Sequence, residues 1–253
     1  MAAVAPRRAA GDDSEMKPAR PDLLPDRELS REDMRTLQLA IRDKAIYSRA
    51  TQLDEKPLTI AGIDQAFGDD TVTSAVVVWR DGDVLAEVTE TVPLEFPYIP
   101  GYLAFREGGP IVAALRSVTV NPDVLLIDGN GRIHPRHAGL ATHVGVVMDM
   151  PAVGVAKSLL CGILADSPDR PLSTGTQLPI YDEETGSTII GYALQTKQWD
   201  SPDRWINPVY VSPGHYVDAD TAVAVVEQSL DGYKIPEPIR LADRVAAEST
   251  GTR

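Results

Sequence analysis

The stretch NPDVLLIDG at residues 121–129 is the most informative for the fold, because it holds an uninterrupted apolar run, 124–127, between turn-forming residues. A run of this kind is typical of a strand that is buried on both faces of a sheet. A second apolar run, Ala152–Ala156, follows it, and residues 139–150 between the two have a helical pattern. The alternation of strand and helix predicts an α/β fold with helices on the faces of a sheet.

Hairpin-like segments surround this centre, so the expected sheet is mixed. The expected strands outside the centre are 58–63, 71–79, 84–92, the two strands of a hairpin at 178–195, and 208–211. The expected helices are 30–50, 101–118 and 218–230. Ser30 and Asp33 form a capping-box pattern at the start of the first helix, and Asp218 is a suitable N-cap for the last.

The length of 253 residues suits a single large domain. Residues 1–28 combine Ala, Pro, Arg and acids without a period, which predicts a disordered arm. We expect one folded domain over 29–245 and a frayed tail over 246–253. The N-terminus lacks the apolar segment of a secretory signal, and no apolar run is long enough to cross a bilayer, so the predicted location is the cytoplasm.

The charge of the chain is strongly acidic, with 37 Asp and Glu against 24 Lys and Arg and a formal net charge of −13. This balance argues against a protein that holds nucleic acid through a basic coat. It remains compatible with carboxylates that hold divalent cations, because the metal then supplies the positive charge. The single cysteine, Cys161, excludes an internal disulfide framework and a Cys-rich zinc site.

Acidic residues follow two of the expected central strands. Asp64 comes directly after the apolar run 59–63, and Asp128 comes after 124–127. If these strands are parallel neighbours, the two carboxylates meet at one edge of the sheet, where their hard oxygen ligands suit Mg²⁺ or Mn²⁺. Each acid could instead cap a turn, and Glu107, in the helix expected at 101–118, could be a solvated surface acid.

Basic and aromatic side chains lie near these acids in the sequence. Lys157 follows a buried strand and is either a surface lysine or a cation directed at phosphate. The spacing of the four histidines, His134, His137, His143 and His215, matches no zinc signature. Tyr98 lies in a loop stiffened by Pro97 and Pro100, where it is either buried packing or a wedge between stacked bases.

Seven short motifs resemble the endonuclease V family in order and spacing, over about three quarters of the chain, from Leu58 to Ala242. They are GID at 62–64, FPYIPG at 96–101, FRE at 105–107, LIDG at 126–129, HPR at 134–136, GVAK at 154–157 and SPGH at 212–215. The resemblance implies a ribonuclease H-like fold. It also implies magnesium-dependent cleavage of DNA at the second phosphodiester bond 3′ to deoxyinosine, the product of adenine deamination, as a step in DNA repair.

The resemblance also implies roles for individual residues. Asp64, Asp128 and Glu107 are similar to the family's metal-binding acids, with Mn²⁺ as an alternative to Mg²⁺. Lys157 is similar to the cation near the scissile phosphate, and His215 to the residue that orients or deprotonates the attacking water. Tyr98 is similar to the wedge that fills the gap left by the displaced base. The residues similar to the family's base pocket and DNA contacts are Leu103, Gly129, Gly131, His134 and Gly139.

One departure and several open alternatives accompany the resemblance. Asn130 stands where many bacterial relatives have His, which affects the expected substrate preference and not the expected reaction. Inosine-containing RNA or a single strand is an alternative substrate, since the sequence does not identify groups that would contact 2′-hydroxyls. A non-cleaving inosine-binding module would require a broken acid set. We expect a monomer that acts without a membrane.

Overall fold

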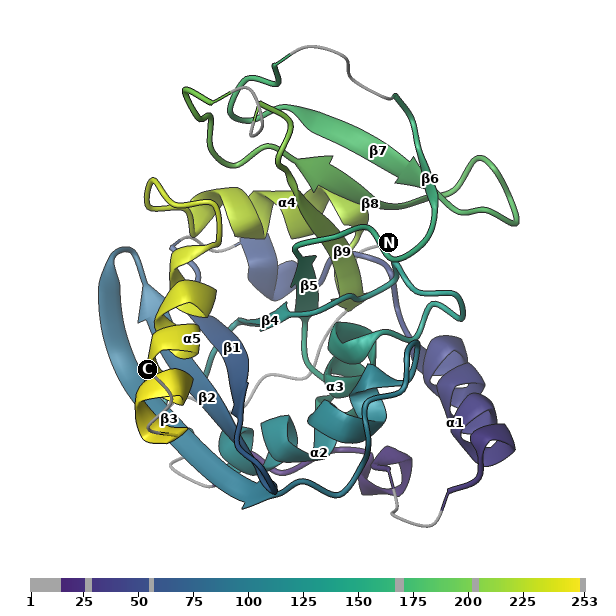
Figure 1. Cartoon of the computed structure of the whole chain (residues 1–253), viewed down its shortest axis with the longest axis vertical. Helices are drawn as coiled ribbons and strands as arrows, with labels where there is room; N and C mark the ends of the chain where they lie inside the picture. The colour runs from purple at the N-terminus through teal and green to yellow at the C-terminus, as the bar shows by residue number, and fades with distance from the viewer. Residues whose placement is uncertain (1–14, 26–28, 55–56, 167–170, 202–204, 251–253) are drawn as a thin grey trace.

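The computed structural model describes residues 15–25, 29–54, 57–166, 171–201 and 205–250. Its nine strands form one sheet in the order β3-β2-β1-β4-β5-β9-β8-β7-β6 (Figure 1). The strands are β1 Ile60–Phe67, β2 Thr71–Arg80, β3 Asp83–Pro93, β4 Val124–Asp128, β5 Ala152–Ala156, β6 Ile163–Leu164, β7 Gln177–Tyr181, β8 Ile189–Leu194 and β9 Val209–His215. The helices are α1 Arg31–Lys44, α2 Leu103–Arg116, α3 Leu140–Met148, α4 Ala219–Gln228 and α5 Glu237–Thr250, with short 3₁₀ turns at Pro21–Leu23 and Thr51–Asp54.

The sheet is mixed, as predicted. β1, β4 and β5 are parallel neighbours at its centre. β2 and β3 extend one side as antiparallel strands, and β9, β8, β7 and β6 extend the other. The central strands are buried on both faces, which explains their unbroken apolar runs.

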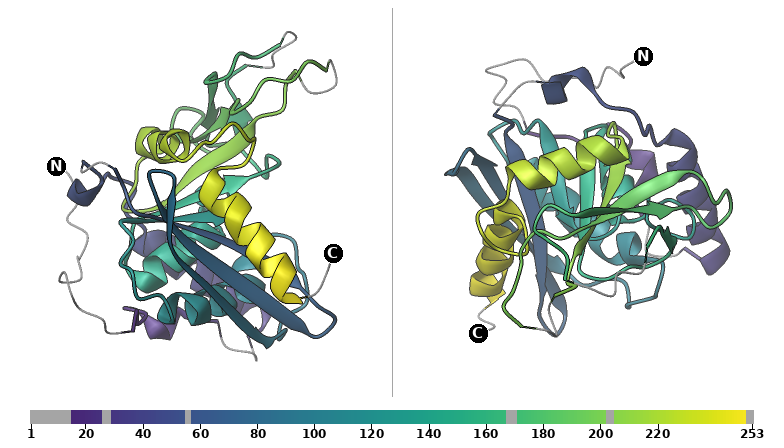
Figure 2. Two further views of the ribbon diagram at one scale, coloured as in Figure 1. Left: turned by 90° about the vertical axis from the view of Figure 1, so that its left-hand side faces the viewer. Right: turned by 90° about the horizontal axis from the view of Figure 1, so that it is seen from above.

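Helices cover both faces of the sheet (Figure 2). Apolar residues of α2 and α3 form one core with the strands, with Ile111 and Leu140 among its buried members. Residues of α4 and α5 form a second core on the opposite face, with Val223 and Ile239 among its members. The carboxyl ends of the central strands therefore open between two helical layers, and this is where functional crevices lie in α/β sheets.

The capping predictions are confirmed, but one predicted strand boundary is wrong and one helix was not predicted. Ser30 forms a capping box with Asp33, and Asp218 caps α4 by accepting a hydrogen bond from the Thr221 amide. β1 does not end before Asp64 but continues to Phe67, because β2 pairs with it along its whole length. The sequence reading also missed α5 entirely.

The N-terminal segment is packed where the structure describes it. Met16 and Leu23 are buried against the α2/α3 core, and the Arg20 amide donates to the Val147 carbonyl. Residues 15–25 thus do not belong to a disordered arm, whereas the prediction for 1–14 and 26–28 lies outside the described residues. At the other end α5 continues to Thr250, which leaves only 251–253 of the predicted tail undescribed. No helix among the described residues is long and apolar enough to span a membrane.

Candidate active site

Two aspartates meet at the edge of the sheet because β1 and β4 run parallel in register. Ile63 pairs with Ile127, so the residues that follow them, Asp64 and Asp128, leave the paired region side by side. Glu107 approaches from α2, which lies on one face of the sheet. The sequence prediction that these strand ends are adjacent is confirmed.

The electrostatics of the three acids show that they share one site. Burial, reinforced by the charge of Asp128, raises the pKa of Asp64 to about 7. Burial, reinforced by the charges of Asp64 and Asp128, raises the pKa of Glu107 to about 8. Neighbouring carboxylates that are buried away from water repel one another, so the cluster favours the binding of either a proton or a cation.

Lys157 supplies a positive charge at the same edge. It follows β5, and its Nζ atom donates to Asp128 Oδ2 over 2.6 Å. Partial burial lowers the pKa of Lys157, but the charges of Asp128, Asp64 and Asp243 outweigh burial and raise it above its ordinary value. The Lys157 side chain is 59% exposed, so its ammonium can move toward a bound anion.

Asp243 is a fourth acid that the sequence reading missed. It lies on α5, which packs against β1 so closely that a Cβ on Gly62 would come within 2.2 Å of the Pro238 backbone. The charge of Asp243 raises the pKa of Asp64 further, in addition to burial and the charge of Asp128. The apolar spacing of Ile239, Ala242 and Ala246 was the signal that could have revealed this helix.

His215 does not lie with the acids, which contradicts the prediction that it orients the attacking water. It pairs with Ala152 at the start of β5, whereas Asp128 pairs with Val155 near the end of that strand. Three residues of strand separate these positions by roughly 10 Å. The ring is fully buried, its Nδ1 accepts from the Ile46 amide, and its Nε2 lies 3.4 Å from Asp149 Oδ1.

Asp149 makes His215 part of a structural junction. Asp149 ends α3 in a left-handed conformation and also accepts a 2.7 Å ion-paired hydrogen bond from Arg20. The junction therefore joins the N-terminal segment, α3 and β9. Burial lowers the pKa of His215 to about 4 in spite of the nearby Asp149 carboxylate.

Tyr98 is exposed on a loop whose base is firmly held. Its side chain is 66% exposed, which disfavours the buried-packing alternative. The loop ends at Gly101, whose φ of 77° suits glycine. The Gly101 carbonyl accepts from Gln38 Nε2 at 2.9 Å, from His134 Nε2 at 3.0 Å and from Arg136 Nη2 at 2.9 Å.

His134 supports this loop through both of its ring nitrogens. Nε2 donates to the Gly101 carbonyl, so Nδ1 is the acceptor for the Arg136 amide at 3.1 Å. Burial lowers the pKa of His134 to about 4, which keeps the ring neutral. His134 thus holds the loop in place through Gly101, and its contact with the base stays a prediction.

The glycines expected around the base lie where backbones approach closely. A Cβ on Gly131 would lie 2.4 Å from the Pro213 carbonyl oxygen, and one on Gly139 would lie 2.3 Å from the Asn130 carbonyl oxygen. Gly129 has a φ of 152° beside Leu140. Leu103 is half-buried at the start of α2. The three glycines shape the loop that leads from Asp128 into α3.

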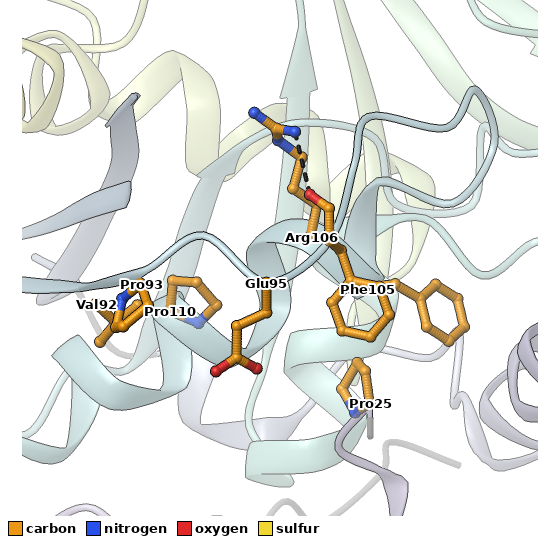
Figure 3. A pocket seen from close by; sticks show the side chains of 9 residues that line it. Pro25, Val92, Pro93, Glu95, Phe105, Arg106 and Pro110 are labelled. Carbon is orange, nitrogen blue, oxygen red and sulfur yellow. Dashed lines mark hydrogen bonds between the residues drawn. The ribbon is translucent and has the colours of Figure 1, made fainter. Parts of the chain in front are cut away.

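A separate pocket of about 200 Å³ lies on the outer side of α2 (Figure 3). Figure 3 shows Pro25, Pro110 and Phe105 around it, with the Glu95 carboxylate among them. The Arg106 guanidinium turns away to donate to the Phe96 carbonyl over 3.2 Å. Glu95 and Phe96, which precede the Tyr98 loop, line this pocket. The residues predicted to contact the nucleobase do not line it.

The donor set fits a divalent cation that binds with its own water. Among the described residues, no group of three or more His, Cys, Asp or Glu side chains is close enough together to hold a metal ion. Mg²⁺ does not require such a group, because it usually binds one or two carboxylates together with water and substrate phosphate. The adjacent Asp64 and Asp128 supply that pair.

Comparison with known proteins gives one consistent result. A family model described as Endonuclease V matches residues 43–244. Endonuclease V of Haloarcula marismortui is 46% identical over 265 aligned positions, which cover 93% of this chain and 98% of that relative. Endonuclease V of Halobacterium salinarum is 50% identical, with coverage of 82% of this chain and 81% of the relative.

Solved structures agree with the sequence relatives. The crystal structure of endonuclease V from Streptomyces avermitilis superposes with a TM-score of 0.76 at 33% identity, covering 92% of this chain and 96% of that one. Endonuclease V of Ciona intestinalis, solved in complex with a 24mer DNA containing an inosine followed by a ribo-adenosine, has a TM-score of 0.73 at 26% identity. That superposition covers 87% of this chain and 97% of the other.

Proposed function

This chain belongs to the endonuclease V family, and from this premise we propose that it is a magnesium-dependent enzyme that recognises deoxyinosine in DNA. It hydrolyses the second phosphodiester bond on the 3′ side of the lesion and so begins its repair. The observation that carries the proposal is the convergence of Asp64, Asp128, Glu107 and Lys157 at the edge of the central sheet. Asp243 completes this acidic cluster from the opposite face.

Asp64 and Asp128 would hold the cation, and the charges of Glu107 and Asp243 act on the same site. When bound, the metal supplies charge to the scissile phosphate and lowers the pKa of the attacking water. Lys157 Nζ binds Asp128 Oδ2 in this structure and would be free to bind a phosphate oxygen once that carboxylate held a cation. Glu107, whose pKa is already raised, can hold a proton beside the reacting phosphate.

Recognition takes place on the α2/α3 side of the acids. Tyr98 fills the gap in the base stack after the inosine leaves it. The Gly101 carbonyl accepts three hydrogen bonds, which fix the loop that presents the ring. Extrusion costs less for a mispaired base, which favours damaged over normal DNA. Asn130 Oδ1, which has no hydrogen-bond partner among the described residues, is available to accept from the base.

The test is cleavage of matched DNA and RNA oligonucleotides that each contain one inosine, with magnesium and with EDTA. We expect the DNA to be cut one nucleotide beyond the inosine in magnesium and to remain intact in EDTA. Cleavage of the RNA alone would transfer the proposal to inosine-containing RNA. Binding without cleavage of either oligonucleotide would indicate a non-cleaving inosine-binding module. Cleavage in EDTA would contradict the proposed dependence on magnesium.

A further inference from the structure

A basic and aromatic surface lies beside the acidic cluster, on the α4/α5 side of the sheet. Lys197 Nζ lies 5.6 Å from the centroid of the Trp199 ring and 5.7 Å from that of Tyr233. Arg240 on α5 stacks on Tyr233, with its Cζ 4.4 Å from the ring centroid. We refer to Lys197, Trp199, Tyr233, Lys234 and Arg240 as the platform.

Buried hydrogen bonds hold the two loops of the platform in place. Gln195, at the end of β8, is fully buried, and its amide binds the Lys197 carbonyl at 2.9 Å and the Asn207 amide at 3.0 Å. Thr196 Oγ1 donates to the Lys234 carbonyl over 2.6 Å, which ties this loop to the turn between α4 and α5. Both loops lie on the same side of the molecule in Figure 1. The rings are therefore presented with little ordering cost on binding.

The platform is continuous with the acids. Burial and the nearby charge of Lys157 lower the pKa of Lys234, so these two ammonium groups face the same region. Lys234 Nζ donates to Asn207 Oδ1, which fixes its position. Arg240 precedes Asp243 by three residues, so they share one face of α5. Lysine ammonium groups thus extend from Lys157 through Lys234 to Lys197, which lies beside Trp199.

This surface differs sharply from the rest of an acidic protein. The whole chain carries a formal charge of −13, yet Lys197 lies here beside two aromatic rings, and Arg240, which is ion-paired with Glu237, stacks on one of them. In the part of the chain that the structure describes, neither Lys197 nor Lys234 is ion-paired with a carboxylate. Tyr233 remains 48% exposed. Aromatic rings among backbone-directed cations are the features with which proteins bind single strands of nucleic acid.

We propose that the platform binds the DNA strand on the 3′ side of the bond that is cut, by stacking an unpaired base on Trp199 or Tyr233. The direction rests on the proposed function. Tyr98 and the 129–139 loop hold the inosine on the α2/α3 side, and the acids cut on its 3′ side. The strand that continues past the acids then reaches the α4/α5 side, where Lys197 and Lys234 neutralise its phosphates.

The experiment compares inosine oligonucleotides with a constant 5′ flank and either a long 3′ flank or one that ends just past the cut. For the parent we expect kcat/KM to be about tenfold higher on the long substrate, the scale of one stacked base. The Trp199→Ala, Tyr233→Ala double variant should lose this preference and cut the short substrate as the parent does. Replacement of both residues by Phe should restore the preference, because the stacking faces are kept.

Three results would overturn the platform: a parent indifferent to the 3′ flank, an unchanged preference in the double Ala variant, or a loss that follows the 5′ flank instead. A separate measurement distinguishes this from failure of the proposed function. The parent should bind an undamaged oligothymidylate strand about tenfold more tightly than the double Ala variant, whether or not it cuts inosine DNA. Equal binding by both proteins would contradict the platform proposal, whatever the outcome for the proposed function.

Discussion

Asp64 is a residue of the site whose ionisation clearly lowers the stability of the fold. Its pKa is raised to about 7 by burial and by Asp128, whereas an unfolded Asp titrates near 4. Between these values the folded chain binds more protons than the unfolded chain, so stability falls as the pH rises through this window. The ionised carboxylate is therefore a liability to the metal-free fold above pH 7.

We predict that Asp64→Asn raises the melting temperature at pH 8 in EDTA by about 2–4 °C, the equivalent of about 1 kcal/mol for a protein of this size. Cleavage should fall by a factor on the order of 10²–10³, the scale of losing one charge-stabilising group. Melting curves and turnover are measured together, with Asp81→Asn in the β2–β3 turn as the control. A lower melting temperature or normal turnover would contradict the assignment.

Tyr98 is predicted to act through its ring. Tyr98→Ala should lose about ten- to a hundredfold in affinity for inosine-containing duplex, because base–aromatic stacking contributes ~1–3 kcal/mol. Tyr98→Phe should lose little. Since the side chain is 66% exposed, the melting temperature should stay unchanged in both variants. An Ala variant that binds normally would exclude the wedge.

His215 is predicted to support the fold. Burial lowers its pKa to about 4 from an ordinary value of 6.5, so its stabilising contribution is complete above about pH 6.5 and is lost as the pH falls toward 4. His215→Gln should cost about 1 kcal/mol at pH 7, because the Ile46 amide loses its hydrogen bond to Nδ1, and should melt with less dependence on pH in this window. Turnover per folded molecule should change little. A hundredfold loss of kcat with an unchanged melting curve would restore the catalytic role.

At the scale of elements, the contact between β1 and α5 decides whether Asp243 reaches the site. Gly62→Ala would place a methyl group within 2.2 Å of the Pro238 backbone, so α5 must move away. We predict a loss of about 1–3 kcal/mol, the usual cost of overpacking, together with reduced cleavage. Gly109→Ala in α2 has open space and should be neutral or slightly stabilising. A fully active, stable Gly62→Ala protein would show that this contact is not required.

The sequence predicted the elements with strong local patterns. The capping box of Ser30 and the unbroken apolar run 124–127 each specify their element without help from distant residues. The proximity of Asp64 to Asp128 was predictable for the same reason, because each aspartate ends the apolar run of one such strand. A mixed sheet with helices on both faces then follows from the order of the elements.

What the sequence did not predict depends on long-range packing. The motif around His215 suggested a catalytic residue, but the antiparallel pairing of β9 places that histidine at the far end of β5. α5 begins at Glu237-Pro238 after a short turn, and its only local signal is the spacing of apolar residues. Asp243 joins the acids because Gly62 lets that helix approach β1, which no local pattern reveals.

At the scale of the whole molecule, an acidic enzyme must bind an acidic polymer. The net charge of −13 predicts weak affinity for undamaged duplex at physiological salt. Under the proposed function, Lys157 and the cation that Asp64 and Asp128 would hold oppose this repulsion at the site itself. Binding of metal and binding of DNA should therefore support each other.

The most direct test of this account is the affinity of the parent for inosine-containing duplex in calcium and in EDTA. Calcium takes oxygen ligands as magnesium does and can fill the carboxylate site, so binding can be measured without relying on cleavage. We predict that affinity is at least about tenfold higher in calcium, which corresponds to a coupling free energy of ~1.4 kcal/mol. Equal affinity in calcium and in EDTA would contradict the claim that the acids at this edge of the sheet hold the metal that binds the DNA.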